Sequence, residues 1–145
     1  MIDINIVIQR LKAGSPAEPL WTDVKAISDL STLDVNRSGL RGVTLFVVQQ
    51  SESASADVRG SGPYLQTLTE TLGIVIVAKV VNSDQFDFKP VRQMLRERLF
   101  GWSPDNDHEP FWLGSGRLMN VQRGQVTWMD NFITEYTEDQ NRYGS

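Results

Sequence analysis

The sequence predicts an α+β fold in which helices pack on a mostly antiparallel sheet. Helical patterns occur at the start and in the middle of the chain. Segments with strand character fill much of the rest, without the strict alternation of strand and helix that marks a parallel sheet. The 145 residues, 40% of them hydrophobic, can build one sizeable core but not two ordinary domains. We therefore expect a single domain over residues 1–145.

The N-terminal part predicts two helices followed by a loop. Apolar residues recur at helical spacing from Ile4 to Leu11. After a break at a glycine and two prolines, Thr22 or Asp23 can cap a short second helix. Its apolar stripe would run over Val24–Leu30. Residues Asn36–Gly42 are expected to form a loop.

The middle of the chain predicts one buried strand and one overlong strand. Gly42–Val48 is β-branched and aromatic and dense enough to be buried on both faces, which indicates a central strand. Gln49–Gly62 is polar and without periodicity, so we expect a mobile loop. Strand character then persists over Tyr64–Val81, far beyond the usual length of about 5–6 residues. Such a strand bends at Gly73 or projects to pair with another chain.

The best-defined helix follows a turn at Asn82–Asp87. Pro90 suits the first helical turn, and the apolar face of Val91–Leu99 continues from it. Gly101 suits a left-handed stop after that helix, and Pro104 prevents the helix from resuming.

The C-terminal part predicts antiparallel strands. Phe111–Val121 and Val126–Tyr136 are apolar runs, and Arg123-Gly124 between them indicates a hairpin turn. Gly114-Ser115-Gly116 resembles a fragment of a phosphate-binding loop but lacks the Lys-Ser/Thr pair and the third glycine. We interpret it as a bend or bulge in a strand.

Composition excludes several classes of function. The chain has no cysteine, so disulfides, zinc–thiolate sites and cysteine nucleophiles are excluded. The formal charge of −4 repels nucleic acid at long range. Met1–Asn5 has no basic signal-peptide region, and the longest apolar run, Ile74–Ala78, is far below the roughly 20 residues of a membrane span. We expect protein partners, and neither a membrane nor a cofactor.

One cluster of potential metal ligands suggests an alternative. Asp105, Asp107, His108 and Glu109 supply oxygen and nitrogen donors, which would suit a metal-dependent hydrolase. The calcium-loop template fails here, because its sixth and twelfth positions fall on Pro110 and on a glycine. A single histidine also makes a catalytic triad improbable. We favour a solvated loop, with no catalytic or metal-binding residue.

A basic stripe lies on the best-defined of the predicted helices. Lys89, Arg92 and Arg96 are spaced as on one face of a helix. They could meet DNA or an acidic neighbouring subunit, and a solvated helix face is the simpler interpretation.

From Leu68 onward the order of segments resembles the phage tail terminator (tail completion) family. The resemblance covers about half of the chain, and it includes the N-terminal helices more loosely. The residues that carry it are Thr69-Glu70-Thr71-Leu72-Gly73-Ile74-Val75-Ile76-Val77, Pro90-Val91-Arg92 to Leu95, Gly101-Trp102-Ser103-Pro104, Gly116-Arg117-Leu118, Val126-Thr127-Trp128, Phe132 and Tyr136.

The resemblance implies an α+β fold like that of the lambda tail terminator, and no enzymatic activity. It implies a homo-oligomeric ring of six copies that caps the tail tube, ends its polymerisation and docks the head-completion or connector protein. DNA would only pass through the lumen. The protein would occupy the head-proximal end of the tail in the virion, and the host cytoplasm during assembly. Another head–tail joining protein, a stopper or neck protein, is the nearest alternative.

A cyclic ring requires a heterologous interface, in which one surface of a subunit meets a different surface of the next. An exposed edge on Thr67–Val81 or on Val126–Tyr136 would serve. Each of the four tryptophans, taken alone, is expected in the core. Taken together, they suggest that another subunit covers part of the surface. The residues expected at the subunit interface are Thr67, Thr69, Thr71, Arg92, Arg96, Trp112, Trp128 and Tyr136.

Overall fold

The computed structural model describes residues 1–14, 18–27, 42–56, 64–80, 86–122 and 124–140. The predicted loop at Asn36–Gly42 falls outside this part except for Gly42, as does most of the predicted turn at Asn82–Asp87. The elements, in chain order, are α1 (Ile4–Lys12), β1 (Asp23–Ala26), β2 (Val43–Ala54), β3 (Leu65–Lys79), α2 (Lys89–Leu99), β4 (Trp112–Gln122) and β5 (Gln125–Asp139).

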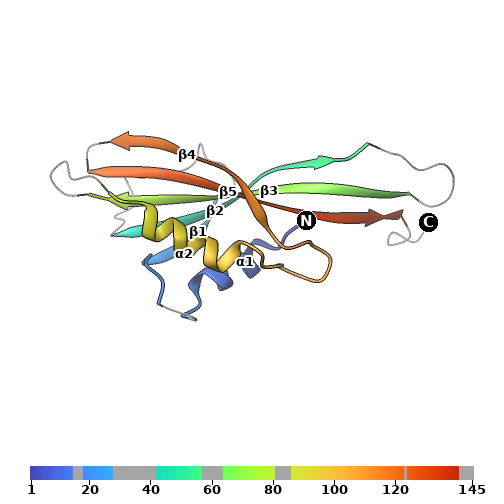
Figure 1. The fold of residues 1–145 in the computed structure, drawn as a ribbon, viewed down its shortest axis with the longest axis horizontal. Coiled ribbons are helices and arrows are strands. Elements are labelled where there is room, and N and C mark those ends of the chain that lie inside the picture. Colours follow the sequence, from blue (N-terminus) through green and yellow to red (C-terminus); the bar gives the residue numbers. More distant parts are fainter. Residues whose placement is uncertain (15–17, 28–41, 57–63, 81–85, 123, 141–145) are drawn as a thin grey trace.

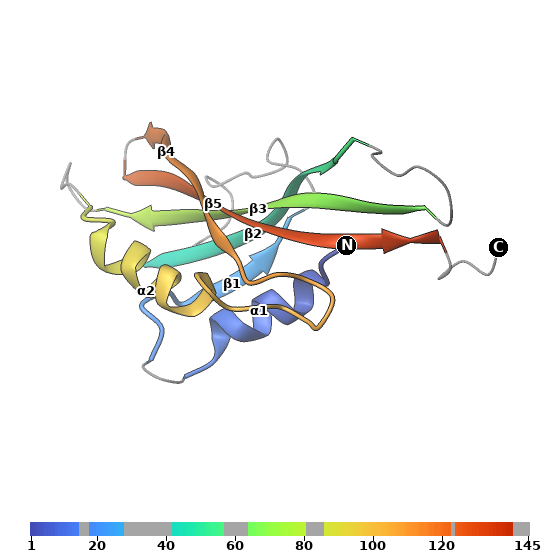
Figure 2. The same cartoon turned by 45° about the vertical axis from the view of Figure 1, so that its right-hand side comes forward.

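The strands form one five-stranded sheet in the order β1-β2-β3-β5-β4. Only the β1–β2 pair is parallel, and the other three pairs are antiparallel. Both helices lie against the same face of the sheet, at one end of its long axis (Figures 1 and 2). The prediction of an α+β fold with a mostly antiparallel sheet is therefore confirmed.

The main core lies between the helices and the sheet. Val7 and Leu11 of α1 and Leu95 of α2 are fully buried there, against alternate residues of the strands such as Ile74 and Phe132. A smaller cluster occupies the other face of the sheet, and its buried residues are Phe46, Val48, Val75, Val77 and Met129. The inner strands are thus apolar on both faces over this length, as the sequence predicted for the first half of β2. Over this length β2 lies between β1 and β3, so it is an internal strand, and β3 holds the middle position of the sheet.

The two helices are tied together at their C-terminal ends. Arg98 of α2 is buried, and its Nη1 donates to the carbonyl oxygens of Arg10 and Ala13 at the end of α1. In return, Arg10 Nε donates to the carbonyl oxygen of Arg98 at 2.9 Å. Burial lowers the pKa of the Arg98 guanidinium, and the nearby charge of Arg10 lowers it further. Trp21 Nε1 also donates to the Leu11 carbonyl oxygen at 2.9 Å, so orphan carbonyls at this helix end have partners.

Two local predictions were wrong. The segment that begins at Thr22 and Asp23 leads into strand β1 and not into a second helix. A stripe of three apolar residues suits either structure, and the backbone hydrogen bonds that β2 offers decide between them: Thr22 N donates to the Val43 carbonyl oxygen at 2.7 Å, and Ile27 N to that of Val47 at 3.1 Å. The predicted loop from Gln49 is also wrong over its first residues, because β2 continues to Ala54. Residues 57–62 of that loop lie outside the described part.

The prolines and glycines that predicted where helices and strands begin and end were confirmed. α2 begins with Lys89 and Pro90, and Gly101 after its end has a φ of 80°, in the left-handed region that favours glycine. Gly124 forms the β4–β5 hairpin turn with a φ of 79°. β3 is 15 residues long and passes through Gly73 without interruption. The irregularity falls instead on β2, where Gln50 is bulged opposite Leu72 and Thr71.

Candidate functional site

Three strands extend past the helices as an arm. We define the arm as Gln49–Ala54 of β2, Leu65–Thr71 of β3 and Ile133–Asp139 of β5. These strands are paired with one another, with one bulge at Gln50. Figure 1 shows these strand ends alone on the side of the molecule away from α2. Leu65 is seven residues beyond Leu72, the last core residue of β3, so the arm reaches about 23 Å at about 3.3 Å per residue. Most residues of the arm are exposed or half-buried, and only Glu70, Thr134 and Tyr136 are buried.

One face of the arm is lined by small hydroxyl side chains. Thr67, Thr69 and Thr71 alternate with the residues that face the helices, so they point to the opposite side. Ser53 and Ser51 of β2 are their partners across the ladder at Thr69 and Thr71. The side chains of the three threonines are half-buried. Glu135, the partner of Thr69 in the ladder, lies on the same face, so this face offers hydroxyl groups and a carboxylate.

The other face of the arm gathers carboxylates around Tyr136. The Tyr136 hydroxyl is hydrogen-bonded to Glu52 Oε1, and Glu70 and Glu138 are close enough to act on it electrostatically. Burial raises the pKa of the Tyr136 phenol above its ordinary value, and the bond to Glu52 and these negative charges raise it further. With Glu135 and Asp139 on the opposite face, the strands of the arm contain five carboxylates: Glu52, Glu70, Glu135, Glu138 and Asp139.

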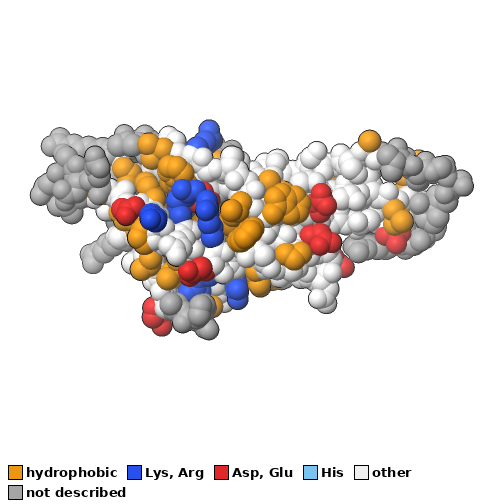
Figure 3. All heavy atoms as spheres, viewed as in Figure 1, with side chains coloured by type: hydrophobic (Ala, Val, Ile, Leu, Met, Phe, Trp, Pro, Cys, Tyr) orange, Lys and Arg blue, Asp and Glu red, His pale blue; other side chains and the backbone are white. Residues whose placement is uncertain are grey.

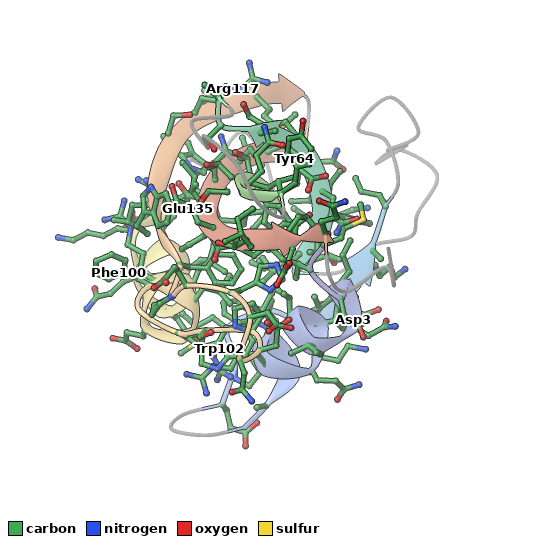
Figure 4. The ribbon with its side chains drawn as sticks, turned by 90° about the vertical axis from the view of Figure 1, so that its right-hand side faces the viewer. Asp3, Tyr64, Phe100, Trp102, Arg117 and Glu135 are labelled. Carbon is green, nitrogen blue, oxygen red and sulfur yellow. The ribbon has the colours of Figure 1, made fainter. Side chains whose placement is uncertain are left out.

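The strands of the arm contain no Lys or Arg. In Figure 3 the Lys and Arg side chains gather over the end of the molecule that carries α2, and none is visible on the described part of the arm. Arg59 and Arg142 fall outside the described residues. Figure 4 looks along the molecule from the arm end, with Glu135 of β5 and Tyr64, which precedes β3, labelled, and with both helices on one side of the sheet.

A polar cluster, buried at Glu70 and His108, lies where the arm joins the body. We call Glu70, Asp105 and His108 the root cluster. His108 Nε2 is 3.0 Å from Glu70 Oε1, and His108 Nδ1 is 2.7 Å from Asp105 Oδ1. Glu70 also accepts a hydrogen bond from the backbone N–H of Ile2 at 3.1 Å. A doubly protonated imidazole ring can donate to both carboxylates, whereas a neutral ring can donate to only one.

The root cluster fixes the loop after α2 to the edge of the arm. Burial acts to raise the pKa of Asp105, but hydrogen bonds from the His108 ring and from the backbone N–H groups of Asp107 and His108 outweigh it, so the pKa is lowered. Next to this cluster, Glu109 N donates to the Glu135 carbonyl oxygen at 2.9 Å, and the Thr134 hydroxyl donates to the Glu109 carbonyl oxygen at 2.5 Å. These hydrogen bonds hold the loop against β5.

The hypothesis of a metal site at Asp105, Asp107, His108 and Glu109 finds no support in this geometry. The ring of His108 turns inward, and both of its nitrogens contact carboxylates. Within the part of the chain that the structure describes, no group of three or more His, Asp or Glu residues is arranged to hold a metal ion.

At the other end of the molecule, α2 presents a shallow cationic groove. We call it the α2 groove. Its lining residues are Asp87, Phe88, Lys89, Arg92, Gln93 and Arg96, and its volume is about 500 Å³. The basic stripe that the sequence predicted thus lies on one open surface.

Arg92 is held in place by groups of β4 and β5. Its Nε and Nη2 donate to the two carboxylate oxygens of Asp130 at 2.9 and 3.0 Å, and its guanidinium lies 4.5 Å from the centre of the Trp128 ring. Trp128 Nε1 donates to Asp130 Oδ1 at 3.1 Å. A Cβ atom on Gly116 would clash with that same oxygen, so only glycine leaves room for this arrangement. Arg92 and Trp128 are thus structural parts of the groove, whereas Lys89 and Arg96 are exposed.

Edge strand β4 exposes apolar side chains along its length, from Trp112 opposite Ile133 to Leu118 opposite Trp128. Trp112 and Leu113 are each 37% exposed and Leu118 is 52% exposed. The pairing with β5 shifts register between Leu113 and Gly116, so the predicted bend at Gly114-Ser115-Gly116 is confirmed as a bulge. Bulges of this kind make an edge strand a poor template for further strands.

The structure distributes the eight predicted interface residues over four places. Thr67, Thr69 and Thr71 share one face of the arm, and Arg92, Arg96 and Trp128 belong to the α2 groove or its wall. Trp112 begins β4. Tyr136 is buried at the inner face of the arm, in contact with His108.

Sequence reasoning missed the carboxylates of the arm, because they come from three strands and only the ladder register brings them together. It also missed exposed Tyr64, Leu65 and Leu118.

Comparison with known proteins places the chain in a family. Residues 1–142 match the family model described as Phage tail terminator protein. With the fold, this match defines a structural protein of bacteriophage tails, a component of the virion that interacts with other tail components. More particularly, the chain belongs to the phage tail terminator protein family. No curated protein matches it. None of its described helices is long and apolar enough to cross a membrane.

Proposed function

We propose that this chain forms a homo-oligomeric ring, of six copies, that caps the tail tube, ends its polymerisation and docks the head-completion or connector protein. The observation that carries the proposal is the projecting arm of a chain in the tail terminator family. Three paired strands extend about 23 Å past the core, and among their residues only Glu70, Thr134 and Tyr136 are buried. A segment with this construction is suited to contact another chain. We further propose that residues 1–145 act as one domain with the fold of the lambda tail terminator.

The two ends of the molecule supply the unlike surfaces that a cyclic ring needs. The arm ends in exposed Tyr64 and Leu65, and the opposite end carries the α2 groove and β4. Among the described residues, β1 covers only Thr44–Val47 of β2, so the outer edge of β2 from Gln49 has no strand beside it. The net charge of −4 is compatible with DNA that passes through a lumen without adhering.

Electron microscopy of tails assembled by a phage that lacks this gene tests the proposal. We expect overlong tubes without heads, because nothing ends polymerisation. Tails of normal length that stay unjoined to heads would assign the protein to the head–tail joint. Normal virions would refute both assignments. Purified protein added to tail tubes should bind at one end only. That end should be the one that becomes the head-proximal tip of the mature tail.

A further inference from the structure

We propose that His108 is a pH-sensitive switch between the loop after α2 and the arm. When the arm is held against the loop, the His108 ring carries two protons and a positive charge, and the loss of one proton loosens the arm. The switch belongs to the single folded chain. It therefore goes beyond the proposed function and does not depend on ring formation.

The contacts of the His108 ring carry the inference. Its Nε2 is 3.0 Å from Glu70 Oε1, and its Nδ1 is 2.7 Å from Asp105 Oδ1. An ionised carboxylate accepts hydrogen bonds and donates none, so each contact needs a proton on the ring nitrogen. A neutral ring has only one such proton, and in either tautomer a nitrogen lone pair would face a carboxylate oxygen. The geometry therefore fits the doubly protonated ring.

Burial makes the charge of the ring matter. The side chains of His108 and Glu70 are 3% and 5% exposed, so water has little access to replace a lost partner. Buried charged groups are stable in proteins when they are paired. Burial acts to raise the pKa of Asp105, but hydrogen bonds from the His108 ring and from backbone N–H groups outweigh it, so the pKa is lowered. Asp105 is thus charged at neutral pH.

Other titratable groups surround the root cluster. They come from β2, β5, the loop and the N-terminal residues: Glu52, Tyr136, Glu138, Asp107, Glu109 and the Met1 amino group. Burial and the neighbouring carboxylates raise the pKa of Tyr136, so its phenol stays neutral near pH 7. The Met1 amino group is 3.6 Å from Glu70 Oε1, on a side chain that is 68% exposed. Among the described residues, no Lys or Arg pairs with Glu70 or Asp105. His108 is therefore the buried source of positive charge in the cluster.

The His108–Glu70 contact joins the loop to the whole width of the arm. In the sheet, Glu70 lies opposite Glu52 of β2 and Thr134 of β5, so the three strands of the arm meet at this point. Beside it, Glu109 N bonds to a carbonyl oxygen of β5. Loss of a ring proton removes one of the two carboxylate contacts of His108, and the loop and the arm should then separate more often.

The direction of the pH dependence follows from this proton. Histidine side chains ordinarily change charge between about pH 5 and 8. The held arm binds the second ring proton, whereas a loosened arm leaves the ring free to release it. The hold on the arm is therefore complete at the acidic end of this range and is lost as the pH rises.

Nitrogen NMR and amide hydrogen exchange on the full native chain test the switch. His108 is the only histidine in the sequence, so its ring signals need no assignment. We expect both ring nitrogens to be protonated at about pH 5 and one to lose its proton towards about pH 8. Exchange in Leu65–Thr71, measured against Leu72–Ala78 in the same sample, should rise at least about tenfold with the same midpoint. A ring that is already neutral at pH 5, or arm exchange that does not follow the ring, would overturn the proposal.

Two variants identify the pair that acts. His108→Gln can still donate to Glu70 but does not titrate, so the pH dependence of arm exchange should disappear. In Glu70→Gln, the amide can accept the Ile2 N–H and donate to an unprotonated Nε2, so a neutral ring makes both contacts. The dependence should then reverse, with the arm held more tightly at about pH 8 than at about pH 5.

A matched control is Glu135→Gln, the same substitution on the opposite face of the arm, which should keep the native pH dependence. Thermal unfolding of each variant checks that it folds, and the NMR titration of the native chain decides the proposal even where a variant does not. A dependence that persists in His108→Gln would assign the effect to another group, such as the Met1 amino group, and would overturn the switch. An unreversed dependence in Glu70→Gln would also overturn it. Because these measurements use the isolated chain, their failure would leave the proposed terminator function untouched.

Discussion

The body and the arm share three strands, β2, β3 and β5, but are stabilised in different ways. In the body, β3 from Leu72 to Ala78 is buried on both faces, and the helices cover one of them. In the arm, the same strand from Leu65 to Thr71 is exposed or half-buried except at Glu70. The body therefore gains its stability from apolar burial. The arm depends on backbone pairing and on the root cluster, which leaves its faces available to another chain.

The largest effect should come from a cavity in the body. Phe132→Ala removes a fully buried ring that packs edge-on against Phe111. We expect the free energy of unfolding to fall by about 4 kcal/mol, as measured by urea denaturation. Thr69→Ala on the arm is the matched test and should change it by less than about 0.5 kcal/mol. Equal losses at both sites would contradict the contrast between body and arm.

The next effect should come from the root cluster. His108→Ala leaves the buried carboxylate of Glu70 without its ring partner, and we expect a loss of about 3 kcal/mol in unfolding free energy. Amide hydrogen exchange should accelerate in the arm more than in α1. The double variant with Glu70→Gln should lose less than the sum of the single losses, because the two side chains act as a pair. Additive losses would show that they do not.

The wall of the α2 groove should give an intermediate effect. Arg92→Ala removes a bidentate ion pair and a cation–π contact, so we expect a loss of about 1.5 kcal/mol and a change in tryptophan fluorescence. Arg96→Ala, one helical turn further on an exposed position, should change stability by less than about 0.5 kcal/mol. A similar loss of stability for both arginines would contradict the stabilising role of the Arg92–Asp130 ion pair.

The smallest effect should be a loss of unfolding free energy at acidic pH. The pKa of Asp105 is lowered in the folded chain from its ordinary value of 3.8. Its contribution to stability is therefore complete above that pH and is lost as the pH falls through the lower, folded value. The side chain is 34% exposed, so solvent screening keeps the effect below about 1 kcal/mol. Asp105→Asn should flatten this part of a plot of unfolding free energy against pH, and an unchanged slope would refute the assignment.

The elements that the sequence predicted well carry their own signals at both ends. α2 has Pro90 in its first turn and Gly101 after its end, and no other part of the chain is needed to place it. β1 has no such signals, because its structure depends on hydrogen bonds to β2. Local patterns cannot report a bond to a residue some twenty positions away.

The candidate surfaces were predicted in part for the same reason. Lys89, Arg92 and Arg96 are close in sequence, so helical spacing was enough to place them on one surface. Asp105 and His108 are also neighbours, but Glu70 lies 38 residues from His108 and turns a suspected metal cluster into a structural contact. The carboxylates of the arm come from β2, β3 and β5, and their grouping follows from strand register alone.

The paired ends of the two helices also have a mechanical consequence. Arg98 donates hydrogen bonds to the last carbonyl oxygens of α1, while Arg10 donates one to the carbonyl oxygen of Arg98 itself. A displacement of α2 should therefore move α1 with it, because these hydrogen bonds join the two helix ends directly. The two helices should therefore respond as one layer to a contact made on either of them.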